Sequence, residues 1–308
     1  MRHVVPVLVG ALVVALLVLG YGKTFFKPPQ QPDVIEGQGG WLYVGWDRLV
    51  DDYPRNARAA VKLAGRVDRE FKGRGQRLLV MVVPNKGRVV PEHLPDRQRA
   101  AVERSEGYGK LIASLRAAGV QVFDTYPLLE AAHRRDGRAY SPRDAHWTAH
   151  TAEEAAVAAV PLVKAMGGLP GPPGGGDQIA GWETVRRYPD LVVILRRQGV
   201  MTYGEDAFEE RVYTPPTGKW GPVAVVGSSF VDRKYGFPQM LSHLLDRPVT
   251  RRVEFGLEGA WQAMAEQLKD RSAPPQKVVV WQVSEGSFAN GDAPAAVEAY
   301  FKGGKAGK

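Results

Sequence analysis

The sequence predicts an α/β fold in which a central, mostly parallel sheet is flanked by helices. Three strongly apolar runs lie far apart in the chain: residues 78–83 and 223–226 are uninterrupted, and residues 278–283 contain one polar residue, Gln282. Such runs suit strands that are covered on both faces, as in a parallel sheet. Segments with helical spacing of apolar residues separate the three runs. This alternation of strand and helix is typical of α/β domains.

The N-terminal residues 1–27 are predicted to form a signal anchor. Residues 4–20 are almost entirely apolar and approach the roughly 20 residues that a membrane-spanning helix needs. A cleaved signal peptide is the alternative, but residues 20–23 make a poor cleavage site. Basic residues on both sides of the run leave its orientation open. A stiff, proline-rich linker is predicted to follow at residues 28–36.

A single domain is predicted over residues 37–300. Two glycines at residues 39–40 form a turn into a short strand, and Gly73 and Gly75 end the first helix. In its first half the chain is predicted to contain a strand at residues 41–44, a helix at 56–71, a strand at 78–83, a helix at 97–118 and a strand at 120–123.

The second half continues the alternation. A capping box, Thr151-x-x-Glu154, predicts the start of an alanine-rich helix that Pro161 should kink or end. Residues 166–176 are interpreted as a surface loop, and residues 191–195 fit either a helical turn or a strand. The remaining predicted elements are a strand at residues 223–226, a helix at 234–245, a strand at 249–255, a helix at 261–268, a strand at 278–283 and a disordered tail at 301–308.

Two short motifs together indicate nucleophilic catalysis. In an extended segment, residues i and i+2 point to the same side, so Asp144 can reach one ring nitrogen of His146 and leave the other free. The run at residues 223–226 continues into Gly227-Ser228-Ser229, a turn that can expose a hydroxyl nucleophile. An aspartate, a histidine and a serine are the three members of a catalytic triad. The competing explanations are a structural histidine and a serine that caps the next helix.

Composition excludes several classes of site. The 308 residues contain no cysteine, so the chain has no disulfide, no thiol nucleophile and no cysteine metal cluster. No histidine–carboxylate group has the spacing of metal ligands, and we expect neither a metal nor a cofactor. The net charge of +8 favours a polyanionic partner, but the basic residues are scattered and no nucleic-acid motif is present.

Several further motifs accompany these two. They are Gly40-Trp41-Leu42-Tyr43, Val83-Pro84-Asn85-Lys86, Asp144-Ala145-His146-Trp147, Gly227-Ser228-Ser229-Phe230, Gly256-Leu257-Glu258-Gly259 and the segment at residues 281–288. Together they resemble the SGNH hydrolase-like domain of the alginate O-acetyltransferases of the AlgJ and AlgX type. The resemblance covers about residues 37–288 and implies that Ser229 is the nucleophile, His146 its base and Asp144 the orienting carboxylate. Ser228 stands where ordinary SGNH hydrolases often have aspartate, and Gly286 where a basic residue is expected.

The resemblance also implies an activity and a setting. It implies acetyl transfer through an acyl-serine to hydroxyls of an acidic or neutral exported polysaccharide such as alginate. A membrane-bound O-acyltransferase would supply the acetyl group, in a periplasm to which residues 1–27 anchor the protein at the inner membrane. An SGNH-type acetylesterase uses the same residues and remains an alternative. A catalytically silent scaffold or glycan-binding subunit of an export complex is the other.

Five further residues are candidates for substrate contacts. Trp147 fits a substrate-lining role or core packing equally well, and Trp261 is a candidate for stacking on a sugar ring. Lys86 is either a contact for substrate or acetate or a structural lysine. Backbone amides stabilise the oxyanion in acyl transfer, and Ser229 supplies one candidate, aided by a helix expected after Phe230. Gly259 or Asn85 would supply the second donor.

Overall fold

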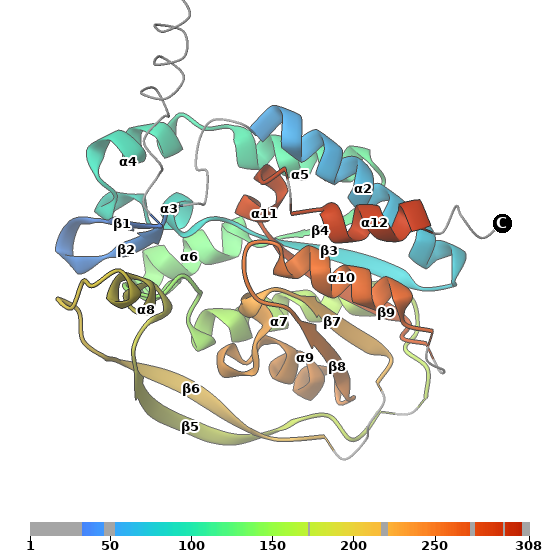
Figure 1. Cartoon of the computed structure of the whole chain (residues 1–308). Helices are drawn as coiled ribbons and strands as arrows, with labels where there is room; N and C mark the ends of the chain where they lie inside the picture. Colours follow the sequence, from blue (N-terminus) through green and yellow to red (C-terminus); the bar gives the residue numbers. More distant parts are fainter. Residues whose placement is uncertain are drawn as a thin grey trace, which may run out of the picture. The chain divides into compact units, whose positions relative to one another are not determined.

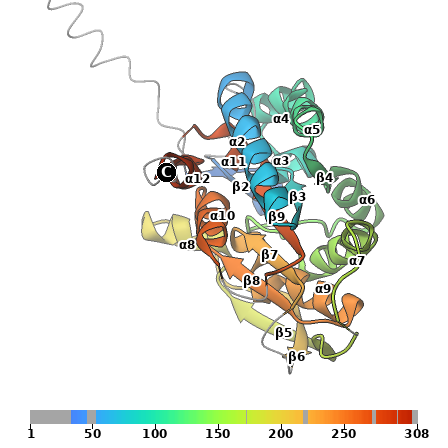
Figure 2. The same ribbon diagram turned by 90° about the vertical axis from the view of Figure 1, so that its right-hand side faces the viewer.

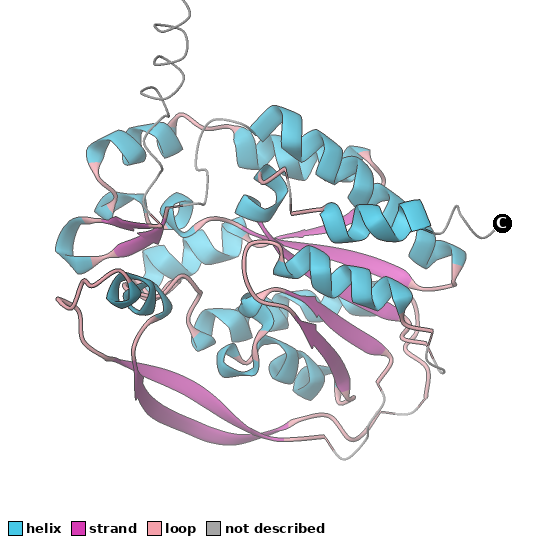
Figure 3. Ribbon diagram, in the orientation of Figure 1, coloured by secondary structure: helices cyan, strands magenta, loops and turns pink. Residues whose placement is uncertain are grey.

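The central sheet of the described residues has five strands, all parallel. These strands are β3 (Arg77–Val83), β4 (Gln121–Asp124), β7 (Val223–Gly227), β8 (Val249–Val253) and β9 (Val278–Ser284). Their order is β4-β3-β9-β7-β8, which confirms the predicted α/β fold (Figures 1 and 3). The structure is a computed structural model that describes residues 33–45, 53–171, 173–216, 221–271, 275–291 and 293–303.

Helices cover both faces of this sheet (Figure 2). One face packs against α2 (Tyr53–Gly73), α5 (Gly107–Ala117), α10 (Gly259–Lys269), α11 (Glu285–Ala289) and α12 (Ala295–Gly303). The other packs against α6 (Tyr126–Asp136), α7 (Ala149–Ala165) and α9 (Phe237–Leu245). In β3, alternate side chains enter the two cores, so all of residues 78–83 are buried. Burial on both faces explains why residues 78–83 of β3 are continuously apolar.

Two antiparallel pairs lie outside the central sheet. The first joins β1 (Val34–Glu36) to β2 (Leu42–Val44). The second joins β5 (Gln178–Arg187) to β6 (Asp206–Thr214), with α8 (Asp190–Arg197) between them. We call residues 178–214 the β5–β6 arm (Figure 1). The ambiguous residues 191–195 are therefore helical, and their apolar side chains pack against β1 and β2.

The helix predicted at residues 97–118 is two helices, α4 (Asp96–Glu103) and α5. Between them Ser105 Oγ accepts the backbone N–H of Gly107 at 3.3 Å. Serine side chains offer the backbone this alternative to helical hydrogen bonds, and here the alternative interrupts the helix.

The predicted start of α7 is wrong, and the helix does not end at Pro161. The helix begins one turn before the predicted capping box, because Thr148 is the N-cap and its side chain accepts the N–H of Thr151. The helix also continues through Pro161. Proline leaves the carbonyl four residues earlier, at Val157, without its helical partner. Val157 is exposed, so solvent can satisfy that carbonyl.

The predicted anchor at residues 4–20 lies outside the described residues. Within the described part of the chain, no helix combines the length and apolar character needed to cross a bilayer. Strand β1 occupies the end of the predicted linker at residues 28–36, and α12 extends to Gly303 at the start of the predicted tail. The rest of that tail lies outside the described residues.

Candidate active site

The candidate nucleophile stands on a turn at the carboxyl end of β7. Gly227 ends this strand, and a Cβ atom there would lie 2.7–3.0 Å from atoms of Gln282 in the neighbouring strand β9. The backbone N–H and Oγ of Ser228 both donate to Gln282 Oε1, at 2.9 and 2.8 Å. These contacts fix Ser228 and leave Ser229, the first residue of the short turn η3 (Ser229–Val231), as the serine that faces the histidine.

Ser229, His146 and Asp144 form a continuous hydrogen-bonded chain. Ser229 Oγ lies 2.7 Å from His146 Nε2, and His146 Nδ1 lies 2.7 Å from Asp144 Oδ1. The imidazole is held between the rings of Phe230 and Tyr235, each with its centroid 4.7 Å away. The three residues predicted from the sequence are therefore brought together at hydrogen-bonding distances.

The loop that carries Asp144 and His146 is a turn and not the predicted extended segment. Asp144 Oδ1 accepts the backbone N–H of His146 at 3.0 Å, which is an Asx-turn. Trp147 Nε1 donates to the carbonyl of Phe230, which ties this loop to the serine turn. The contact between the carboxylate and the imidazole thus comes from local turn geometry.

A second carboxylate, absent from the sequence predictions, reaches the same imidazole. Asp190 Oδ2 lies 3.1 Å from His146 Nδ1, and the backbone N–H of Asp190 donates to Asp144 Oδ2 at 3.1 Å. Asp190 opens α8 and is separated from His146 by 44 positions in the sequence. The available signal was Pro189-Asp190 before helical apolar spacing, which marks a helix start and predicts no contact.

The described residues also contain one group with metal-ligand chemistry. Ligand atoms of Asp144, His146 and Asp190 lie within 4.8 Å of one another, a grouping that the sequence spacing had not predicted. Both imidazole nitrogens already take part in hydrogen bonds, with Ser229 on one side and the carboxylates on the other. The arrangement therefore matches a proton-transfer site in which each donor atom has a protein partner.

The pKa values of the three groups reflect mutual stabilisation. Burial alone would raise the pKa of Asp144, but the hydrogen bond and charge of His146 lower it well below its ordinary range. Burial opposes the charged form of His146, yet the hydrogen bonds to Asp144 and Asp190 raise its pKa above the ordinary 6.5. Burial likewise opposes the charge on Asp190, and His146 lowers the pKa of that carboxyl. The two carboxylates therefore stabilise the protonated form of the imidazole, and the imidazole in turn stabilises their charges.

Of the two alternatives for Lys86, the structure shows the contacts of a structural lysine. It is 3% exposed, and its Nζ lies 2.7–3.0 Å from the carbonyl oxygens of Leu42, Ser141, Pro142 and Asp144. Burial lowers the pKa of the ammonium to about 7, and the charge of Asp144 opposes this shift. Lys86 thus fastens the loop of Asp144 to strand β2.

The two tryptophans cannot stack on a sugar ring, because neither is exposed. Trp147 packs against Phe237 on the face covered by α7 and α9. Trp261 belongs to the core on the opposite face, where it meets Trp281 edge-on and donates to the carbonyl of Ser287. Their size and polar N–H suit core packing with one internal hydrogen bond.

The backbone amides suggested as second oxyanion donors are already used. Gly259 N donates to the carbonyl of Gly256, and Asn85 N donates to Glu285 Oε2. Asn85 retains a buried Nδ2 without a partner among the described residues. The helix expected directly after Phe230 is also replaced by two short turns, η3 and η4 (Arg233–Tyr235), and α9 begins at Phe237. An α-helix dipole therefore does not start at Ser229.

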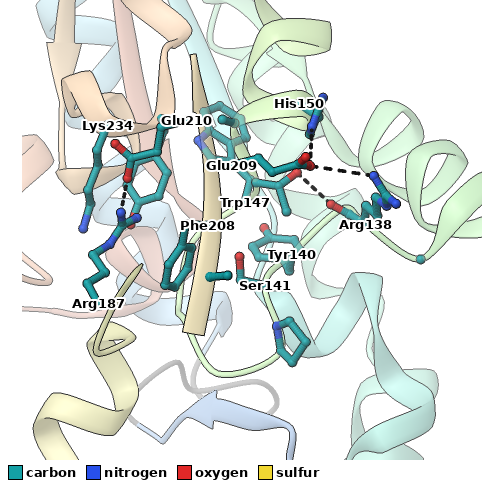
Figure 4. Close-up of a pocket in the computed structure, with 16 residues that line it drawn as sticks. Arg138, Tyr140, Ser141, Trp147, His150, Arg187, Phe208, Glu209, Glu210 and Lys234 are labelled. Carbon is teal, nitrogen blue, oxygen red and sulfur yellow. Dashed lines mark hydrogen bonds and ion pairs between the residues drawn. The ribbon is translucent and has the colours of Figure 1, made fainter. Parts of the chain in front are cut away.

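A pocket of about 280 Å³ lies beside the site, between the loop at residues 137–150 and strand β6 (Figure 4). Trp147 and Tyr235 are among its lining residues, and Tyr235 also stacks on His146. On the rim, Glu209 reaches toward Arg138 and His150, and Glu210 pairs with Arg187. The pocket lining includes neither Ser229 nor His146.

A parallel α/β sheet with a serine at the carboxyl end of a strand, hydrogen-bonded to a histidine and an aspartate, is typical of hydrolase-like α/β domains. Residues 34–285 match the family model described as the SGNH hydrolase-like domain of the acetyltransferase AlgX, and the chain belongs to this family. The resemblance stated from the motifs is therefore confirmed.

Relatives and a solved structure agree with this assignment. A probable alginate O-acetylase AlgJ of Pseudomonas syringae pv. tomato is 26% identical over 83% of the chain and 69% of its own length. The probable alginate O-acetylase AlgJ of Pseudomonas aeruginosa is 32% identical over 41% of the chain and 32% of its own length. The O-acetyltransferase domain of Pseudomonas putida AlgJ superposes with a TM-score of 0.72 and 26% identity, covering 84% of this chain and 93% of that domain.

Proposed function

We propose that the domain is an O-acetyltransferase that carries an acetyl group on Ser229 and transfers it to hydroxyls of an exported, alginate-like polysaccharide. The observation that supports this proposal most is the spacing of the site: 2.7 Å from Ser229 Oγ to His146 Nε2 and 2.7 Å from His146 Nδ1 to Asp144. Membership of the AlgX family adds the reaction type, since its model and the relatives above are named for acetyl transfer.

In the first step, Ser229 Oγ attacks the carbonyl carbon of an acetyl ester while its proton moves to His146 Nε2. The tetrahedral intermediate collapses, the bond to the donor alcohol breaks, and the imidazolium gives that alcohol the proton. Acetyl-Ser229 remains, and His146 is neutral again. Asp144 holds the proton on Nδ1 throughout and stabilises the imidazolium. The backbone amide of Ser229 is our candidate donor to the oxyanion.

In the second step, a sugar hydroxyl takes the place of the donor alcohol. His146 removes the proton of this hydroxyl as its oxygen attacks the acyl-serine, and then returns the proton to Ser229 Oγ. Water competes for the same intermediate, so transfer depends on holding the sugar in position. Good orientation gives effective concentrations of about 10⁵ M and above, far beyond that of water.

The setting proposed for this reaction is the periplasm. In this proposal, residues 4–20 anchor the chain in the inner membrane, and a membrane-bound O-acyltransferase delivers the acetyl group. The apolar run and the net charge of +8 support an exported protein that meets an acidic polymer.

Ser229→Ala and Ser228→Ala form a matched pair for testing the proposal. Both remove one hydroxyl from the same turn, but Ser229 Oγ contacts His146 and Ser228 Oγ contacts Gln282. The purified chain is given p-nitrophenyl acetate and alginate oligosaccharides. Mass spectrometry then follows acetylated sugar, and a separate assay follows free acetate.

We expect Ser229→Ala to lose roughly a thousandfold or more of the transfer rate, and Ser228→Ala to keep most of it. The reverse pattern would show that Ser228 is the nucleophile. Rapid removal of acetate from acetylated polymer, with none added, would favour an acetylesterase. No reaction by the wild type on several polymers, together with an unchanged phenotype of Ser229→Ala cells, would favour a silent scaffold.

A further inference from the structure

We propose that Asp190 is a second positioning carboxylate for His146, delivered by the β5–β6 arm, and that it shares the Nδ1 proton with Asp144. This inference rests on the proposed function, in which His146 is the base. It assigns a role to a residue outside the serine, histidine and aspartate motifs of the sequence.

The first support is the geometry at Nδ1. Asp144 Oδ1 lies 2.7 Å from this nitrogen and Asp190 Oδ2 lies 3.1 Å from it. Both distances lie within hydrogen-bonding range, so one N–H can be shared between two acceptors. An imidazole with two carboxylates on Nδ1 keeps its proton there, which leaves Nε2 free to accept the proton of Ser229.

The second support is that Asp190 also holds Asp144. Its backbone N–H, at the start of α8, donates to Asp144 Oδ2, while Asp144 Oδ1 accepts from His146. The buried carboxylate therefore has separate partners on its two oxygens. Free N–H groups at a helix N-terminus favour a negative charge, so α8 stabilises Asp144 in its ionised form.

The two carboxylates differ in their surroundings. Asp144 is buried, whereas the side chain of Asp190 is 38% exposed and has Lys234 Nζ 3.5 Å from its other oxygen. Solvent and Lys234 weaken the electrostatic effect of Asp190 on the imidazole. The contact with Lys234 also restrains the position of the Asp190 carboxylate. We therefore infer that Asp144 contributes most of the stabilisation of the protonated imidazole. Asp190 adds a smaller contribution that depends on its exposure and on Lys234.

Charged and titratable groups from several elements surround the imidazole of His146. The charged or titratable neighbours are Asp144 on its own loop, Asp190 on α8, Lys234 and Tyr235 on η4, Ser229 on η3, Lys86 beneath Asp144, and Arg187 near Tyr235. Among these, the two aspartates are the groups that meet Nδ1 directly. Removing one of them should lower the affinity of the imidazole for its second proton.

The direct test is an NMR titration of the six histidines of the full-length chain, with the signals of His146 assigned from a His146→Gln spectrum. We expect Asp190→Asn to lower the pKa of His146 and Asp190→Glu to restore part of the shift. Glu205→Gln is the matched control, because Glu205 lies on the same arm, is 43% exposed and pairs with Arg186. This readout requires no catalysis, so it tests Asp190 even if the proposed function fails.

The kinetic test uses hydrolysis of p-nitrophenyl acetate across pH. We expect Asp190→Asn to lower kcat/KM roughly tenfold, the lower end for loss of a hydrogen bond to a charged group. The acidic limb of its pH profile should move to lower pH, because an imidazole with a lower pKa stays neutral at lower pH. In an Asp144→Asn background, Asp190→Asn should lower kcat/KM by a larger factor, since Asp190 is then the remaining carboxylate on Nδ1.

A purely structural role for Asp190 predicts a different result. Its backbone N–H is retained in Asp190→Asn, so α8 and the contact to Asp144 should persist, with an unchanged melting temperature. If the pKa of His146 and the pH profile also match those of Glu205→Gln, the proposal is overturned. An unchanged His146 pKa with reduced activity would likewise overturn it, since the carboxylate would then act elsewhere.

Discussion

Replacing Lys86 with methionine would remove one buried ammonium and leave four backbone carbonyls facing an apolar side chain. These carbonyls belong to Leu42, Ser141, Pro142 and Asp144, at 2.7–3.0 Å from Nζ. Methionine has a similar length, so the change tests the charge and the hydrogen bonds more than the volume. Three of the four carbonyls lie in the loop that precedes His146.

The size of the effect follows from burial. Leaving a buried acceptor without its hydrogen-bond donor costs about 1–3 kcal/mol, so the loss of the donor to several carbonyls should cost about 3–5 kcal/mol together. A typical domain has only about 5–15 kcal/mol of stability, so the variant should fold but with little reserve. At about 2–4 °C for each kcal/mol, the melting temperature should fall by roughly 10 °C. Loss of alignment between His146 and Ser229 should lower activity by roughly a hundredfold.

The assay is thermal unfolding followed by circular dichroism, run beside hydrolysis of p-nitrophenyl acetate. Lys110→Met is the matched control, because Lys110 is 69% exposed and pairs with Glu106 one helical turn away. An exposed pair of this kind contributes less than about 1 kcal/mol. If Lys86→Met melts and reacts like Lys110→Met, the ammonium does not hold the loop.

Three further predictions concern the base, the turn and the anchor. His146 must be neutral to act as a base, and its pKa is raised above 6.5. The value of kcat/KM should therefore fall as the pH drops through a midpoint above 6.5. A midpoint below 6.5 would contradict the pairing of His146 with the two carboxylates. Gly227→Ala would place a Cβ 2.7–3.0 Å from atoms of Gln282, so we expect a loss of about 1–3 kcal/mol in urea unfolding and reduced acetyl transfer; unchanged values would show that β7 and β9 can separate. A phosphatase reporter fused after residue 26 should be active and sediment with membranes, whereas a reporter active only in the cytoplasm would refute the periplasmic setting.

The sequence was informative where a pattern is local. Residues 78–83 and 223–226, and residues 278–283 except Gln282, are apolar because both faces of their strands are covered, and that requirement is visible in the strand itself. The pairing of Asp144 with His146 was likewise predictable, although the structure achieves it through an Asx-turn and not an extended strand. Short-range contacts leave their signal in adjacent residues.

What could not be predicted depends on contacts between distant segments. Asp190 looks like an ordinary first residue of a helix, and only the packing of α8 on β1 and β2 brings it to His146. Lys86 resembles a solvated lysine after a strand until the carbonyls of a loop some 55 residues later surround it. The tryptophans misled for a related reason, because an amphipathic ring suits both a sugar platform and a core.

The position of β9 has a consequence for how the chain is synthesised. This strand lies between β3 and β7, and Arg77 pairs with Val278. The centre of the sheet therefore cannot close until nearly the whole domain has been synthesised and, in the proposed periplasmic setting, has crossed the inner membrane. Until then β3 and β7 present unpaired apolar edges, which are prone to associate with other chains. Nascent chains of this protein should consequently depend on a chaperone that holds them open until residue 284 has emerged.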